Sequence, residues 1–258
     1  MSEIKVDRVG EINHTKKGET IQIIKYEKAN NIEVKFIDYD YVVKTTYSAF
    51  KEGKIKCPYT RSVYGVGYLG EDFYNYKNIR NLIEYQQWRN MLKRCYCESE
   101  LKVHPEYSLI TVCEEWHNFS TYYKWRKENY YEIEGETMHL DKDILHKKTY
   151  QYSPENCVFV PQTINSIFEK SDRAKCKNRN DLPPGVQWIK QNNIYGSACR
   201  VGNNKTIWLG RSHDPIVCFQ RYKRCKENYI KQVADEYKGR IPNKLYNALY
   251  NYEIEIDD

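Results

Sequence analysis

The spacing of apolar residues changes along the chain, and this change limits the folds that the sequence can adopt. From Thr20 to Tyr26 and from Ile32 to Ile37, β-branched and polar residues largely alternate, as in half-buried strands. Between residues 80 and 130, apolar and aromatic residues recur every three or four positions, as in helices. Short strand-like runs return after residue 138. A uniform helical or β fold is therefore excluded, and the sequence predicts an α+β protein.

These changes in spacing divide the chain into four predicted parts. Residues 1–60 predict a small β-rich domain, for which a plain scaffold and a role in phosphate contact both stay open. Residues 61–170 predict a helical lead-in, whose aromatic stripe forms a hydrophobic core, and then a strand–loop–strand–helix unit. Residues 171–184 are polar and predict a linker. Residues 185–258 predict a three-stranded antiparallel sheet packed on one helix.

The last part has the clearest element pattern. Strands are expected over Val186–Lys190, Tyr195–Val201 and Lys205–Leu209, separated by Asn- and Gly-containing turns. A helix is expected over Pro215–Tyr237, because proline favours the first helical position and Asp214 is a good N-cap.

Charge is concentrated at the C-terminal end. Residues 176–252 hold 14 basic and five acidic side chains, a net charge of +9, whereas residues 61–175 are near neutral. Such a segment predicts contact with a polyanion. No apolar stretch approaches the ~20 residues that cross a bilayer, and Met1–Arg8 lacks the apolar run of a signal peptide. We therefore expect a cytoplasmic protein with no membrane partner, whose nine cysteines are mostly thiols.

Three segments of the strand–loop–strand–helix unit resemble the HNH nucleases of phage type. They are Leu140-Asp141-Lys142, Glu155-Asn156-Cys157-Val158-Phe159-Val160 and Ile164-Asn165. The resemblance implies a ββα finger that clamps one divalent cation. It implies that Asp141 and Asn165 bind the metal and that Asn156 closes the loop. A hard cation such as Mg²⁺, or Mn²⁺, prefers oxygen ligands and keeps several waters, so one carboxylate and one amide can suffice.

The position of the general base departs from the family pattern. The family has a histidine directly after the aspartate, where this chain has Lys142, which stays charged at neutral pH. His139 points to the same face of the strand as Asp141 and is the candidate replacement. A chance strand histidine in an inactive nuclease is the alternative. A zinc site from Cys95, Cys97, Cys113 and His117 is less favoured than buried thiols, because the spacing lacks the usual knuckle.

The C-terminal part resembles the DNA-binding domain of plant APETALA-type and ethylene-response factors. The matching residues are Gly185-Val186, Ala198, Trp208-Leu209-Gly210 and Asp214-Pro215. The resemblance implies that the sheet lies in the DNA major groove. By position it implies DNA contacts from Gln187, Lys190, Tyr195, Arg200, Lys205, Trp208 and Arg211.

Together these resemblances predict a metal-dependent endonuclease of the homing type that binds double-stranded DNA in a bacterial or phage-infected cell. The catalytic set expected is His139, Asp141, Lys142 and Asn156. A non-catalytic DNA-binding protein built on a decayed nuclease is the rival interpretation. The oligomeric state stays open, a homodimer included.

Overall fold

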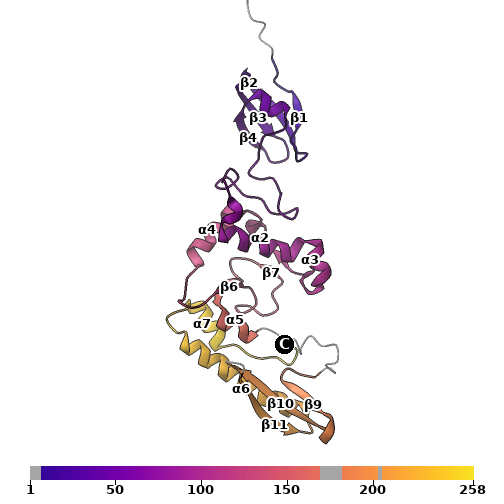
Figure 1. Cartoon of the computed structure of the whole chain (residues 1–258), viewed down its shortest axis with the longest axis vertical. Coiled ribbons are helices and arrows are strands. Elements are labelled where there is room, and N and C mark those ends of the chain that lie inside the picture. Colours follow the sequence, from indigo (N-terminus) through magenta and orange to yellow (C-terminus); the bar gives the residue numbers. More distant parts are fainter. Residues whose placement is uncertain (1–6, 169–181, 203–204) are drawn as a thin grey trace, which may run out of the picture. The chain divides into compact units, whose positions relative to one another are not determined.

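The structure, a computed structural model, describes residues 7–168, 182–202 and 205–258. It contains two compact units, Met1–Glu128 and Asn129–Asp258, and confirms the α+β class (Figure 1). Most of the expected linker, residues 171–181, lies outside the described residues. The four-part division expected from the sequence stays a prediction.

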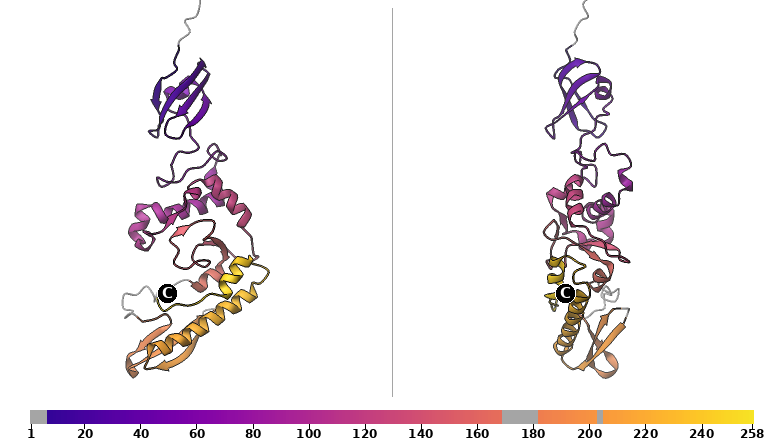
Figure 2. Two further views of the ribbon diagram at one scale, coloured as in Figure 1. Left: turned by 180° about the vertical axis from the view of Figure 1, so that it is seen from behind. Right: turned by 90° about the vertical axis from the view of Figure 1, so that its left-hand side faces the viewer.

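The first unit begins with a four-stranded antiparallel sheet in chain order (Figure 2). Its strands are β1 (Ile12–His14), β2 (Thr20–Lys28), β3 (Asn31–Phe36) and β4 (Tyr41–Thr45). Alternate residues of β2 and β3 are buried, including Ile21, Ile23 and Val34. They pack against Phe50 from the short helix α1 (Tyr47–Lys51). The two strands expected here are confirmed, since their alternation is what lets one face form a core.

Aromatic side chains hold the helical part of this unit together. Trp88 of α2 (Ile83–Tyr96) and Phe119 of α4 (Phe119–Asn129) are fully buried, with ring centroids 5.3 Å apart. Trp88 Nε1 donates to the carbonyl oxygen of Trp116 at 2.6 Å. The aromatic stripe is therefore core, as predicted. The shorter elements between β4 and α4 are η1 (Ile79–Asn81), α3 (Glu98–Val103), η2 (Pro105–Tyr107), β5 (Thr111–Val112) and η3 (Glu114–His117).

The second unit opens with the expected strand–loop–strand–helix arrangement. Strand β6 (Met138–Asp141) pairs antiparallel with β8 (Val158–Pro161), and α5 (Gln162–Phe168) follows directly. The connection contains the short β7 (Gln151–Tyr152). The helix begins at Gln162 and not at Pro161, because Pro161 still lies opposite Met138 in the sheet.

A three-stranded antiparallel sheet on a long helix completes the fold. The sheet has β9 (Val186–Ile189), β10 (Ile194–Val201) and β11 (Lys205–Ser212), with β10 in the centre. The helix α6 (Pro215–Glu236) lies against one face of the sheet in both views of Figure 2. Asp214 Oδ1 accepts from the Ile216 amide at 2.8 Å and caps this helix, as predicted.

One hydrophobic cluster runs through the whole second unit. It joins Val160 and Ile164 of the ββα segment to Phe219 and Val233 of α6. Leu245 of the last helix, α7 (Asn243–Tyr250), belongs to the same cluster. The ββα segment and the C-terminal sheet and helix are thus packed on a common core.

Candidate nucleic-acid interface and ββα site

The sheet of the second unit has one face away from its helix, which we call the outer face. Residues directly opposite each other on paired strands share a face. Gly196 lies opposite both Gln187 and Arg211, Ala198 lies opposite Trp208, and Arg200 lies opposite Thr206. Four of the predicted DNA-binding residues therefore share the outer face: Gln187, Arg200, Trp208 and Arg211.

A β-bulge brings Trp208 and Arg211 to that face together. Residues three apart on a regular strand point to opposite faces. Here the register shifts between Ser197 and Ala198 and leaves Leu209 without a paired residue, which corrects the parity. Gly210 follows with φ +102°, a conformation that side chains disfavour. The glycine in the pattern Trp-Leu-Gly-Arg is the sequence signal for an irregular strand. Strand alternation alone would place the Trp208 and Arg211 side chains on opposite faces.

Trp208 lies over a position with no side chain. A Cβ at Gly196 would come within 2.3 Å of Trp208 Cη2 and 2.8 Å of Ile189 Cδ1. The ring is still 48 % exposed. The absence of a side chain at Gly196 thus lets the Trp208 ring pack on the sheet while about half of this residue stays exposed.

The remaining predicted contacts lie elsewhere. Lys190 is in the turn η5 (Lys190–Asn192), and Lys205 is exposed at the start of β11. Tyr195 packs against the hydrophobic core and its ring centroid is 4.7 Å from that of Trp188. It therefore lies on the helix side of the sheet, away from Gln187 and Arg211.

The electrostatics of the sheet are one-sided. The sequence from Leu182 to Ser212 contains no acidic residue, and its basic residues are Lys190, Arg200, Lys205 and Arg211. Two basic residues of α6, Arg221 and Lys226, are engaged within the protein. Arg221 Nη1 donates to the Arg211 carbonyl oxygen at 3.0 Å, and burial lowers the pKa of Lys226. The sheet therefore carries positive charge without any carboxylate, whereas on the helix Arg221 and Lys226 are engaged within the protein and Arg224 is exposed.

In the ββα segment, one carboxylate oxygen of Asp141 accepts two backbone hydrogen bonds. Its Oδ1 accepts from the amides of Asp143 and Ile144, both at 2.8 Å. Burial raises the pKa of this carboxyl, although the two amide bonds oppose the shift. Within the described part of the chain both of these bonds use Oδ1, and Oδ2 takes part in neither.

Lys142 is held inside the loop. Its side chain is buried, and Nζ donates to Asp143 Oδ1 at 2.6 Å and to the Thr149 carbonyl oxygen at 2.8 Å. An ammonium group held by these two partners does not project from the loop. It is therefore a loop-fixing residue in this conformation.

The other predicted residues of this segment occupy distinct places. His139 lies opposite Val160, on the face of β6 that Asp141 shares, and its Nε2 is buried without a partner among the described residues. Asn156 Nδ2 donates to the Gln151 carbonyl oxygen at 3.1 Å, a bond within the connection between β6 and β8. Asn165 is half-buried on α5.

The donor set limits the choice of metal. Among the described residues no group of three or more His, Cys, Asp and Glu side chains could hold a metal ion, which leaves the zinc alternative without support. The cysteines of the described ranges carry thiols. Carboxylate and amide oxygens, the donor types of Asp141 and Asn165, are ligands that a hard cation such as Mg²⁺ prefers.

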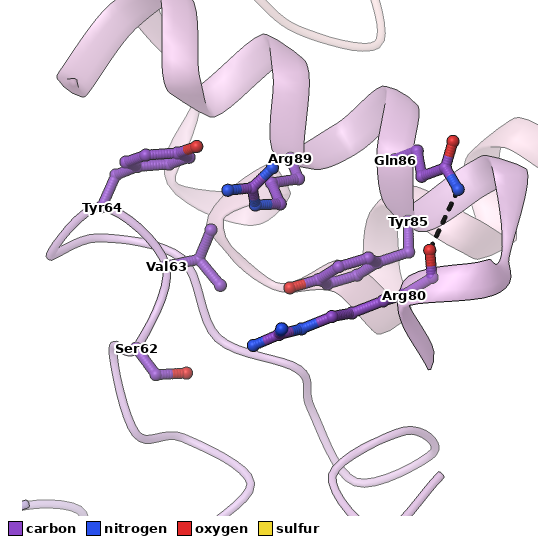
Figure 3. Close-up of a pocket in the computed structure, with 7 residues that line it drawn as sticks. All are labelled: Ser62, Val63, Tyr64, Arg80, Tyr85, Gln86 and Arg89. Carbon is purple, nitrogen blue, oxygen red and sulfur yellow. Dashed lines mark hydrogen bonds between the residues drawn. The ribbon is translucent and has the colours of Figure 1, made fainter. Parts of the chain in front are cut away.

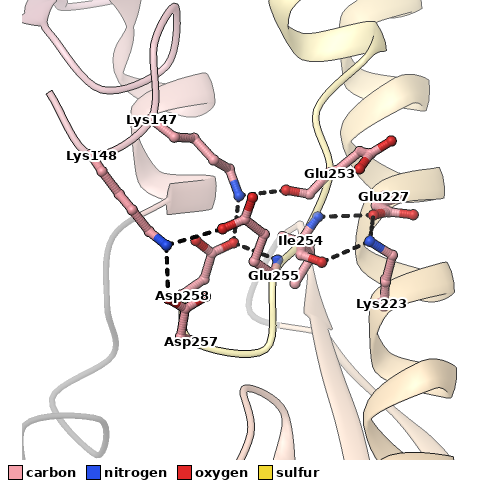
Figure 4. Close-up of polar contacts among 9 residues, drawn as sticks. All are labelled: Lys147, Lys148, Lys223, Glu227, Glu253, Ile254, Glu255, Asp257 and Asp258. Carbon is pink, nitrogen blue, oxygen red and sulfur yellow. Dashed lines mark hydrogen bonds and ion pairs between the residues drawn. The ribbon is translucent and has the colours of Figure 1, made fainter.

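The loop between β6 and β8 also meets the C-terminal tail, residues 253–258 (Figure 4). Lys147 Nζ lies 2.6 Å from Asp258 Oδ2, and Lys148 Nζ lies 2.7 Å from Asp257 Oδ2 and 3.1 Å from Glu255 Oε2. The tail is anchored by Ile254, whose side chain is buried. Its carboxylates therefore neutralise two lysines of the loop. The partners are more than a hundred positions apart, so no local sequence pattern could predict this contact.

Comparisons with protein-family models, with curated proteins and with solved structures found no match to this chain. In the described ranges no helix has the length and apolar character needed to cross a membrane.

Proposed function

We propose that this protein binds double-stranded DNA through the outer face of its C-terminal sheet and cleaves a phosphodiester bond with the ββα segment. The observation that carries the binding step is the gathering of Gln187, Arg200, Trp208 and Arg211 on one face of a sheet that has no carboxylate.

The dimensions and chemistry of this face suit the major groove. Neighbouring strands are ~4.8 Å apart, so the backbones of the two outer strands are about 10 Å apart, against a groove width of ~12 Å. Arginine pairs with phosphates and releases counterions, and arginine or glutamine can read base edges with two hydrogen bonds. Arg200 and Arg211 therefore account for affinity, and Gln187 for part of the sequence preference.

For cleavage, a bound Mg²⁺ or Mn²⁺ would offset the negative charge that develops on the phosphate and leaving oxygen. Asp141 and Asn165 are the residues that would hold it. His139 is the candidate base because it lies two residues before Asp141 on the same strand, and its Nε2 has no hydrogen-bond partner among the described residues. Lys142 pairs with the Asp143 carboxylate of the loop and does not act as the general base.

Two observations favour a second candidate, a DNA-binding protein without nuclease activity. The usual base position holds a lysine that is tied to Asp143 and Thr149. The Nε2 atom of His139 is shielded from solvent, so in this conformation a water molecule cannot reach it to give up a proton. DNA binding is common to both candidates, and cleavage separates them.

Binding is tested with the full chain and a fluorescently labelled duplex at low salt. Arg200→Ala/Arg211→Ala should weaken binding about tenfold or more, the effect of losing two charge-assisted contacts. Arg224→Ala, which removes an exposed arginine from α6, should leave affinity nearly unchanged. Absence of any duplex binding by the wild type would refute both candidates.

Cleavage is tested by plasmid nicking with Mg²⁺, with Mn²⁺ and with EDTA. Asp141→Asn keeps an oxygen for the Asp143 and Ile144 amides but removes the charge, so it should abolish nicking and leave DNA binding intact. Glu155→Gln neutralises an exposed carboxylate of the same loop and should nick normally. A wild type that binds DNA but never nicks it establishes the second candidate.

A further inference from the structure

A cavity of about 380 Å³ lies in the first unit, between the loop after Arg61 and the start of α2. Its polar lining comes from Ser62, Tyr64, Arg80, Tyr85, Gln86 and Arg89. In Figure 3 the guanidinium groups of Arg80 and Arg89 and the hydroxyl of Tyr85 point toward the same space. These residues belong neither to the ββα segment nor to the C-terminal sheet.

The charge of the lining is entirely positive. No carboxylate borders the cavity, and within the described part of the chain neither Arg80 nor Arg89 takes part in an ion pair. Most other arginines of this unit have one: Arg61 pairs with Glu114, and Arg126 pairs with Glu84. Two arginines without a carboxylate beside one cavity have capacity for an anion.

Backbone hydrogen bonds and close packing hold the loop that forms one wall of the cavity. Val63 and Gly67 exchange backbone hydrogen bonds of 3.0 and 2.9 Å, which close the loop around Tyr64. The close packing of Gly67 against Trp88 and Leu92 seats this loop on α2, since a Cβ there would lie 2.5 Å from Leu92 Cδ1. Tyr64 itself has φ +52°, a conformation that non-glycine residues rarely adopt outside constrained sites.

Neighbouring residues hold each of the two arginines beside the cavity. The Arg89 guanidinium lies 5.5 Å from the centroid of the Tyr64 ring. Gln86 Nε2 donates to the Arg80 carbonyl oxygen at 3.0 Å, which ties Arg80 to the first turn of α2. Tyr85 is buried, and its hydroxyl feels the positive charge of both arginines, which oppose the burial that raises its pKa. Both guanidinium groups are therefore close to one hydroxyl donor.

We propose that this cavity binds a phosphate group between Arg80 and Arg89, with Tyr85 as a hydroxyl donor. A planar guanidinium matches phosphate oxygens with two parallel hydrogen bonds, and Tyr64 offers an aromatic surface to an attached base. The phosphate can belong to a free nucleotide or to a DNA strand. Only the second source rests on the function proposed above.

The test uses the full chain and three probes: inorganic phosphate, a deoxynucleoside 5′-monophosphate and a labelled duplex. Calorimetry measures the two small probes, and anisotropy measures the duplex. Arg80→Ala and Arg89→Ala should each weaken binding of at least one probe about tenfold. Arg94→Ala, an exposed arginine on the same helix, should weaken none. Thermal melting checks that the variants are folded.

The pattern across the probes identifies the source. Nucleotide binding that is lost in Arg80→Ala and Arg89→Ala assigns the site to a free nucleotide. An effect on the duplex alone assigns it to a backbone phosphate. If all three probes bind both variants as they bind the wild type, the proposal is wrong. That result differs from failure of the proposed function, which is read from duplex binding by the wild type and Arg200→Ala/Arg211→Ala.

Discussion

At the scale of single residues, Gly185 shows how the sheet is seated on its helix. Gly185 has φ +72°, and a Cβ there would lie 2.0 Å from Tyr222 Cδ2 on α6. The missing side chain lets the chain enter β9 directly against the helix. Gly135, in the same unit, has a similar φ of +79° but open space around it.

This pair separates backbone strain from packing. Gly135→Ala should lower the free energy of unfolding by about 1–2 kcal/mol, the cost of a left-handed conformation. Gly185→Ala adds steric overlap worth about 1–3 kcal/mol, so it should cost clearly more. Urea denaturation of both variants measures the difference. Equal losses would show that Tyr222 moves aside freely.

The general base is a second question at this scale. If His139 accepts the proton, His139→Ala should slow plasmid nicking about 10²-fold or more, the usual size of such a loss. Lys142→His restores the residue that the resemblance expects and should nick at least as fast as the wild type. Rates under single-turnover conditions decide. Nicking by His139→Ala at the wild-type rate would exclude His139 as the base.

The pKa of Asp257 reports on the ion pairs of the tail. Lys148 lowers the pKa of this carboxyl through a hydrogen bond. A lowered pKa means that the pair stabilises the folded tail above the usual titration range of aspartate, and that this stability is lost as pH falls through the lowered pKa. In Lys148→Ala the Asp257 pKa should return toward its ordinary value in an NMR titration of the carboxyl carbon. Lys190→Ala is the control. A pKa unaltered by Lys148→Ala would show that the pair does not form.

At the scale of elements, the sequence predicted most of the last part of the chain. Strands β9 and β10 and helix α6 begin and end within one residue of expectation. Strand β11 extends to Ser212, three residues beyond the expected Leu209, because the bulge interrupts the alternation that marks a strand. Local pattern therefore located the elements, while the bulge decides which side chains share a face.

The candidate site was less predictable than the elements. Alternation along β10 already puts Tyr195 and Arg200 on opposite faces, so the resemblance named one residue too many there, and core packing holds the Tyr195 ring on the helix side. In the ββα segment the order of elements is as expected. The bonds of Lys142 to Asp143 and Thr149 depend on how the loop folds back, which residue spacing does not describe.

At the scale of the whole molecule, some basic residues pair with groups of the protein itself, and others lie on the outer face of the sheet. The acidic tail neutralises Lys147 and Lys148, and several basic residues of α6 bond to the protein itself. The outer face of the sheet keeps Arg200 and Arg211 beside Gln187 and Trp208. The central claim is that this face meets the phosphates of DNA.

The salt dependence of duplex binding tests that claim most directly. Each phosphate contact contributes about 0.9 to the slope of log Kobs against log salt concentration for B-DNA. If Arg200 and Arg211 each neutralise one phosphate, the slope of Arg200→Ala/Arg211→Ala should be smaller than that of the wild type by about 2. Arg224→Ala should keep the wild-type slope. A double variant whose slope equals that of the wild type would contradict the account, because the outer face would then not contact the DNA backbone.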